Sequence, residues 1–138
     1  MIFKKKRQSY KGVTVFEYSG GQWQADFHLS STESVRIEIE SNSKEFPENS
    51  VDCCVSILRR GNALKSECIT KIQEYIANQE APIVPGGSLD IQLESVFVNK
   101  SDDYLVFWGV KPSSSDDYEF EAVVKVDEEG VEVIGFGH

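Results

Sequence analysis

Hydrophobic and polar residues alternate along three short segments near the start of the chain. Residues 12–18 and 22–29 each alternate, and residues 35–40 have the clearest period of two. This period is typical of a strand with one buried face. The pair Gly20-Gly21 favours a tight turn between the first two segments. We therefore expect an antiparallel β-meander over this region.

The apolar period changes to that of a helix after Pro47. Apolar residues follow at positions 51, 54, 55 and 58, and residues 63–78 repeat the pattern. Gly61-Asn62 lies between the two stretches. It is either a break between two helices or an interior position of one long helix, where glycine costs about 1 kcal/mol relative to alanine. We favour two helices.

Four more segments have strand character after the prolines and glycines of residues 82–87. They are separated by short loops rich in turn-forming residues and cover residues 89–99, 104–110, 119–126 and 131–136. The order of strands, helices and strands predicts an α+β fold, with a largely antiparallel sheet and the helices packed on one face. The length of 138 residues suits one domain over residues 12–138. The basic segment 1–11 is either a first strand or a flexible tail.

Charged residues are unevenly distributed along the chain, and their distribution indicates what kind of partner to expect. The net charge is −9, with basic residues clustered before position 12 and acids dominating from Glu80 onward. A negative field repels phosphate backbones and attracts cationic proteins, so we expect a basic protein partner and no direct contact with nucleic acid. The alternative is that the acids only keep the protein in solution. The acids proposed to bind the partner are Asp116, Asp117, Glu119 and Glu121.

The number and spacing of the three cysteines indicate the cellular compartment of the protein. Cys53 and Cys54 are adjacent and Cys68 follows later, a spacing that matches neither a zinc site nor a disulfide scaffold. Cys54 and Cys68 fall on the apolar helix faces, where we expect them to pack in the core. No apolar run reaches the roughly 18 residues of a membrane span, and no signal-peptide core follows the basic start. We therefore expect a cytoplasmic protein without a membrane span.

Residues that could carry catalysis are few. His28 is the only internal histidine, and Asp26 shares its strand face, but no nucleophile lies nearby in the sequence. The paired acids occur in predicted turns without the spacing of a calcium loop, and the glycine pairs lack the lysine of a phosphate cradle. We therefore expect no metal and no cofactor, and a binding protein rather than an enzyme.

The aromatic strand at residues 104–109 is the most distinctive segment. Alternation would place Tyr104 and Trp108 in the core and Phe107 on the opposite face. An alternative is that one of these rings lines a pocket or a partner surface, since aromatic residues dominate interface energetics. Tyr104, Phe107 and Trp108 are therefore candidate pocket or interface residues.

The order of elements resembles a group of uncharacterised bacterial domains. The likeness rests on the strand sequence SLDIQLESVFV followed by YLVFWG, with Phe107-Trp108-Gly109 as its motif-like part. Val110 stands where such domains commonly have a histidine. Some domains of this group are immunity proteins, which neutralise a bacterial toxin by binding it, so the resemblance implies a protein-binding role.

Three functions follow as hypotheses. The first is a protein-binding domain, immunity-like, with a cationic partner. The second is a small-ligand protein or enzyme whose dispersed site includes Asp26, His28, Tyr104 and Trp108. The third is a structural or oligomeric module that pairs through an exposed strand edge such as residues 131–136.

Overall fold

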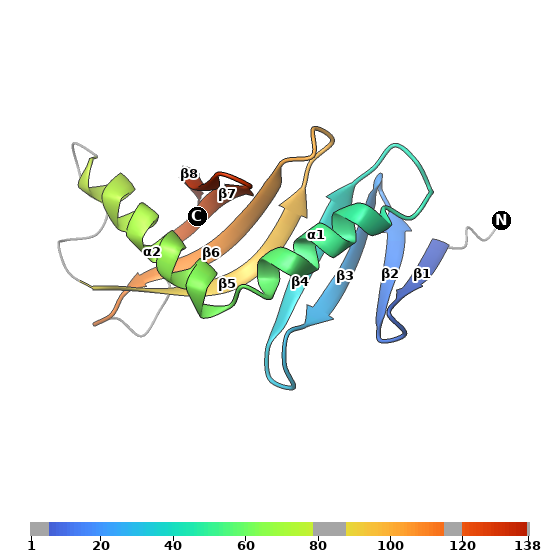
Figure 1. Ribbon diagram of the computed structural model, residues 1–138, viewed down its shortest axis with the longest axis horizontal. Helices are drawn as coiled ribbons and strands as arrows, with labels where there is room; N and C mark the ends of the chain where they lie inside the picture. Colours follow the sequence, from blue (N-terminus) through green and yellow to red (C-terminus); the bar gives the residue numbers. More distant parts are fainter. Residues whose placement is uncertain (1–5, 79–87, 115–119, 138) are drawn as a thin grey trace.

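The computed structural model describes residues 6–78, 88–114 and 120–137. Eight strands form a single sheet whose spatial order follows the chain, with two helices between the fourth and fifth strands (Figure 1). This confirms an α+β composition and a largely antiparallel sheet. The elements are β1 (Lys6–Tyr10), β2 (Thr14–Ser19), β3 (Gln22–His28), β4 (Ser34–Glu40), α1 (Glu48–Leu58), α2 (Asn62–Ala77), β5 (Leu89–Val98), β6 (Tyr104–Pro112), β7 (Phe120–Asp127) and β8 (Gly130–Gly137).

The strands expected from alternation are all present, and β1 is an additional one. It lies within the basic segment 1–11, for which the sequence left both a strand and a tail open. Four of its five residues are exposed and only Tyr10 is buried, so it has no alternating pattern. Pairing with β2 from Lys6↔Tyr18 to Tyr10↔Thr14 makes it an edge strand of the sheet.

Turn chemistry explains why the hairpins close where they do. Gly20 and Gly21 join β2 to β3 with φ of 62° and 80°, the positive values that a two-residue hairpin turn requires. Between β5 and β6, the Asn99 side-chain oxygen accepts hydrogen bonds from the backbone N–H groups of Ser101 and Asp103, both at 3.0 Å. Side-chain acceptors of this kind replace backbone partners in short loops.

The helical region consists of two helices, as preferred from the sequence. Gly61 separates them with φ 56° and ψ −124°, a conformation open almost only to glycine. The buried positions of α1 include Val51, Cys54, Val55 and Leu58, the set that its spacing predicts. Those of α2 are Leu64, Cys68, Ile72 and Ile76.

The pairing of β4 with β5 is the only parallel one in the described sheet. A parallel connection needs a crossover of a dozen or more residues, and α1 and α2 supply it. The two strands pair only from Arg36↔Ser95 to Ile39↔Val98. They lie side by side at one end and diverge toward the β3–β4 turn (Figure 1).

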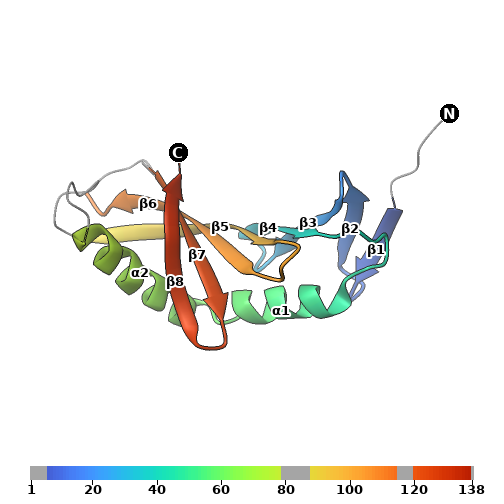
Figure 2. The same cartoon turned by 90° about the horizontal axis from the view of Figure 1, so that it is seen from above.

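The sheet has two unlike faces. Alternate positions such as Trp23, Ile37, Val106 and Val124 are buried and share one hydrophobic core with the buried residues of both helices. We call this the inner face and the opposite one the outer face. The C-terminal hairpin β7–β8 turns steeply relative to β5, so the sheet is strongly twisted (Figure 2). No helix of the described residues is long and apolar enough to cross a membrane.

Candidate functional site

Of the four acids predicted to bind a partner, Glu121 lies in the described structure. Asp116, Asp117 and Glu119 lie outside the described residues. Glu121 is on β7, half-buried on the outer face, directly opposite Gly109 of β6. The structure therefore places one of the four acids near the start of a strand, within the strand predicted over residues 119–126.

Glu121 has an acidic neighbour that the sequence did not indicate. Glu94 is the extra residue of a β-bulge, since Leu93 pairs with Trp108 and Ser95 with Phe107. Its carboxyl group shares a hydrogen bond with that of Glu121. Gly109, which has no side chain, is the β6 partner of Glu121 and of Gln92.

The pKa of Glu94 is raised to about 7. Partial burial is the largest cause, and the hydrogen bond with Glu121 and the repulsion between the two carboxylates add to it. Two carboxyl groups can share a hydrogen bond only when one of them carries a proton. With a pKa of about 7, Glu94 keeps its proton below neutral pH and loses it above. No group of three or more metal-ligating side chains occurs in the part of the chain that the structure describes.

The three candidate aromatic residues separate to different places. Trp108 is buried in the core, while Phe107 is half-buried on the outer face. Tyr104 is half-buried, and its hydroxyl hydrogen-bonds to Cys53 and Ser50 of α1. The pKa of Tyr104 is raised to about 12, mainly by burial and to a smaller extent by the hydrogen bond to Cys53. The phenol therefore stays protonated at neutral pH. Tyr104 thus ties β6 to α1.

Phe107 belongs to a row of apolar side chains across the outer face. Phe97 lies opposite Leu105 in the β5–β6 pair, and Phe107 lies opposite Val123 in the β6–β7 pair. All four are half-buried. We call Phe97, Leu105, Phe107 and Val123 the outer strip. Glu94 and Glu121 lie beside it, so apolar and acidic groups meet on one surface.

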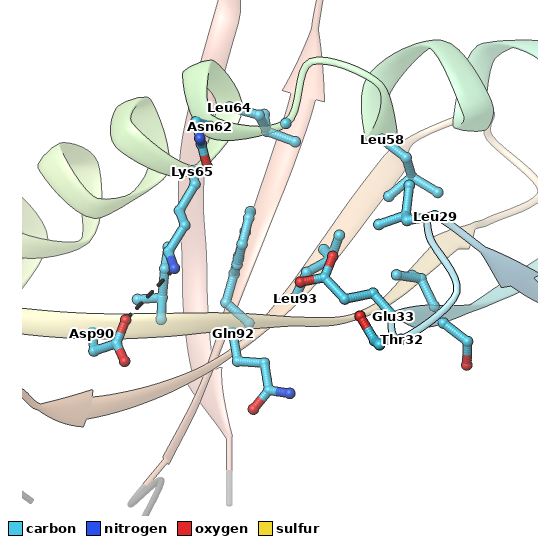
Figure 3. A pocket seen from close by; sticks show the side chains of 15 residues that line it. Leu29, Thr32, Glu33, Leu58, Asn62, Leu64, Lys65, Asp90, Gln92 and Leu93 are labelled. Carbon is cyan, nitrogen blue, oxygen red and sulfur yellow. Dashed lines mark ion pairs between the residues drawn. The ribbon is translucent and has the colours of Figure 1, made fainter.

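A groove of about 670 Å³ opens where β4 and β5 diverge (Figure 3). The β3–β4 turn, the α1–α2 junction and the start of β5 surround it. Its apolar lining includes Leu29, Leu58, Leu64, Leu93 and Trp108. Its polar rim includes Thr32, Glu33, Asn62, Lys65, Asp90 and Gln92.

No protein-family model, curated protein or solved structure matches this chain. The resemblance to uncharacterised bacterial domains therefore stays an expectation from the sequence, and the assignment of function rests on the geometry.

The dispersed site suggested by Asp26, His28, Tyr104 and Trp108 is not assembled. His28 is exposed at the end of β3, and Asp26 pairs with Arg36 at 3.2 Å rather than with the histidine. A second cavity of about 430 Å³ includes Tyr104, and the groove includes Trp108, but neither contains Asp26 or His28.

The cysteines lie as the helical pattern predicts. Cys54 and Cys68 are buried and Cys53 is exposed. Burial raises the pKa of both buried thiols to about 12, so they are uncharged and unreactive at neutral pH. They act as small apolar core residues.

Sequence reasoning missed Glu94, Phe97 and Glu33. The first two become neighbours of the predicted residues only through the strand register and the bulge. The alternation of Phe97 with Val96 and Val98 is the one signal that could have placed it on the outer face.

Proposed function

We propose that this protein is a non-catalytic protein-binding domain that binds a cationic protein through the outer face of its sheet. The observation that carries the proposal is the outer strip, which lies next to the Glu94–Glu121 pair. Binding surfaces combine an apolar centre with a polar rim, and aromatic residues dominate their energetics. Phe107 and Glu121, both suggested by the sequence, belong to this one surface.

In this proposal, α1 and α2 pack against the inner face of the sheet and leave the outer face uncovered. Supporting this, α1 and α2 lie on the same side of the sheet in Figure 2, and their buried residues join the inner-face core. Neither α1 nor α2 lies on the opposite side of β5 and β6 in Figure 2. A row of half-buried apolar residues on an open sheet face is a common mark of an interaction surface.

Charge supports a cationic partner. The chain carries −9, and acids outnumber bases among the charged residues at the outer-face positions of the described strands. Arg36 is already paired with Asp26, and Lys125 with Asp103 at 3.3 Å. Complementary charge accelerates encounter and excludes wrong partners more than it adds affinity. Outer-face acids include Glu17, Asp26, Glu38, Glu40, Glu121 and Glu132, of which Glu17 pairs with Arg7, and Asp26 and Glu38 with Arg36.

An immunity-like role in the cytoplasm is the specific form of this function that the resemblance implies. It requires tight binding of one toxin, which suits a preformed rigid surface such as the face of a sheet. Neutralisation of the partner's activity would follow from binding alone, without chemistry by this protein.

The proposal is tested by affinity capture from the native cells, comparing wild type with two outer-face variants. Phe107→Asn removes the central aromatic ring, and Glu121→Lys reverses one acid. Val13→Asn is the matched control, because Val13 is an exposed apolar residue in the turn between β1 and β2, away from the strip. We expect a basic protein to be retained by wild type and the control, lost from both outer-face variants, and eluted by moderate salt. Retention by all four proteins alike would contradict the proposal.

A further inference from the structure

The start of β5 is an open strand edge inside the sheet. Residues 89–93 pair with β6 from Leu89↔Pro112 to Leu93↔Trp108. Pairing with β4 begins only at Ser95. Among the described residues, no backbone hydrogen bond from another element joins residues 89–94 on the β4 side. An unpaired strand edge offers a row of backbone donors and acceptors to another chain.

Two local features hold this edge open. The bulge at Glu94 lies where the β4–β5 pairing stops, and bulges bend the strand that carries them. On the other side the chain turns back into β3, with the Leu29 N–H donating to the Glu33 carbonyl at 2.9 Å. β4 therefore cannot extend along the free part of β5, and the groove occupies the space between them.

The groove has the lining that an extended peptide needs. Leu29 and Leu93 are half-buried and offer apolar surface beside the strand edge, whereas Leu58 and Leu64 are buried in the core beneath it. Peptides that add a strand to a sheet place alternate side chains into such pockets, while their main chain bonds to the edge. The free edge of about six residues spans roughly 20 Å, enough for a peptide of similar length.

Charge within the groove favours a basic peptide. The Lys65 ammonium lies 3.6 Å from the Asp90 carboxylate, so the two charges offset each other (Figure 3). The Glu33 carboxylate points into the groove and has no hydrogen-bond or ionic partner among the described residues (Figure 3). A lysine or arginine of a bound peptide would supply that partner.

We propose that the groove binds an extended, basic peptide segment of a partner protein, which adds a strand to the free edge of β5. The groove contains no residue of the outer strip, and Glu94 is the one residue that the free edge shares with the Glu94–Glu121 pair. The peptide's backbone bonds to residues 89–94, its apolar side chains enter between Leu29 and Leu93, and a basic side chain meets Glu33.

The test uses a library of random octapeptides selected against the purified full-length protein. We expect selected peptides to be enriched in lysine or arginine and in alternating β-branched residues. Glu33→Lys should weaken their binding about tenfold or more. The matched control Glu45→Lys reverses an exposed acid in a loop outside the groove and should leave binding unchanged.

Amide hydrogen exchange followed by NMR then tests the binding mode. Successive N–H groups of a strand point to opposite sides, so strand addition should slow exchange at every second residue of 89–94. Peptides that bind without this alternating protection would overturn the proposal. So would selected peptides indifferent to Glu33→Lys, or a failure to enrich any peptide.

Two further comparisons separate peptide binding in the groove from binding at the outer strip and from self-association. Phe107→Asn should leave peptide binding intact, so that failure of the outer-strip proposal and failure of this one remain distinguishable. Protection of residues 89–94 that rises with protein concentration in the absence of peptide would assign the groove to a second copy of this chain and overturn the proposal.

Discussion

Glu94 of β5 and Glu121 of β7 meet over β6 on the outer face, joined by a hydrogen bond that needs one proton. Because the pKa of Glu94 is raised from 4.5 to about 7, the folded protein binds this proton more tightly than the unfolded chain. The stability from this group is fully present below about pH 4.5 and is lost as the pH rises toward 7.

Glu94→Gln should remove this pH dependence while keeping a hydrogen-bond donor beside Glu121. Chemical unfolding between pH 4.5 and 7 should show a free energy of unfolding that falls more steeply for wild type than for the variant. Glu45→Gln, an exposed acid outside the pair, serves as the control and should follow wild type. Parallel curves for Glu94→Gln and wild type would show that the pair does not share a proton.

Neighbouring aromatic residues on opposite faces of β6 should differ in their contribution to stability. Trp108 is 2% exposed, so Trp108→Ala leaves a large cavity and should cost about 3–5 kcal/mol. Phe107 is half-buried on the open face, and Phe107→Ala should cost only about 1 kcal/mol. Equilibrium denaturation of the two variants measures both values. Equal losses would mean that the outer face is covered as fully as the inner one.

Gly61 should be intolerant of a side chain because of its backbone conformation. Its φ of 56° and ψ of −124° are strained for any other residue, so Gly61→Ala should cost about 1–3 kcal/mol. Gly135 has neither a positive φ nor an atom within 4 Å of an added Cβ, so Gly135→Ala should be nearly neutral. Thermal unfolding of both variants compares them. A neutral Gly61→Ala would indicate that α1 and α2 can join differently.

The thiols should differ sharply in reactivity. Cys53 is exposed, whereas burial raises the pKa of Cys54 and Cys68 to about 12. A thiol reagent at pH 8 should therefore modify only Cys53 in the folded protein, and all three cysteines after denaturation. Mass spectrometry of the native reaction decides this. Rapid modification of Cys68 would contradict its place in the core.

The strands and helices were predictable where one side of an element is buried. Val35, Ile37 and Ile39 alternate because only the inner face of β4 meets the core, and the helix positions repeat for the same reason. β1 gave no such signal, since its edge position leaves all but Tyr10 exposed. Pairing with a neighbour, rather than its own pattern, defines this strand.

Predicting the candidate sites requires knowing how the strands pair, and the residue pattern of a single strand does not contain that information. Phe107 and Glu121 could be named because one is aromatic in a strand and the other lies in an acidic region. Glu94 joins them only because a bulge shifts the β5–β6 register. The groove arises from the divergence of β4 and β5, which is a property of long-range pairing and leaves no local pattern.

The most direct measurement of the central claim is photo-crosslinking in the native cells. A photoreactive phenylalanine derivative replaces Phe107 on the outer strip or, in a second protein, Gln73 on the exposed side of α2. If the outer face binds a cationic protein, irradiation should join one basic protein to position 107 and leave position 73 without that adduct. Crosslinking of the partner from position 73 and not from position 107 would contradict the account.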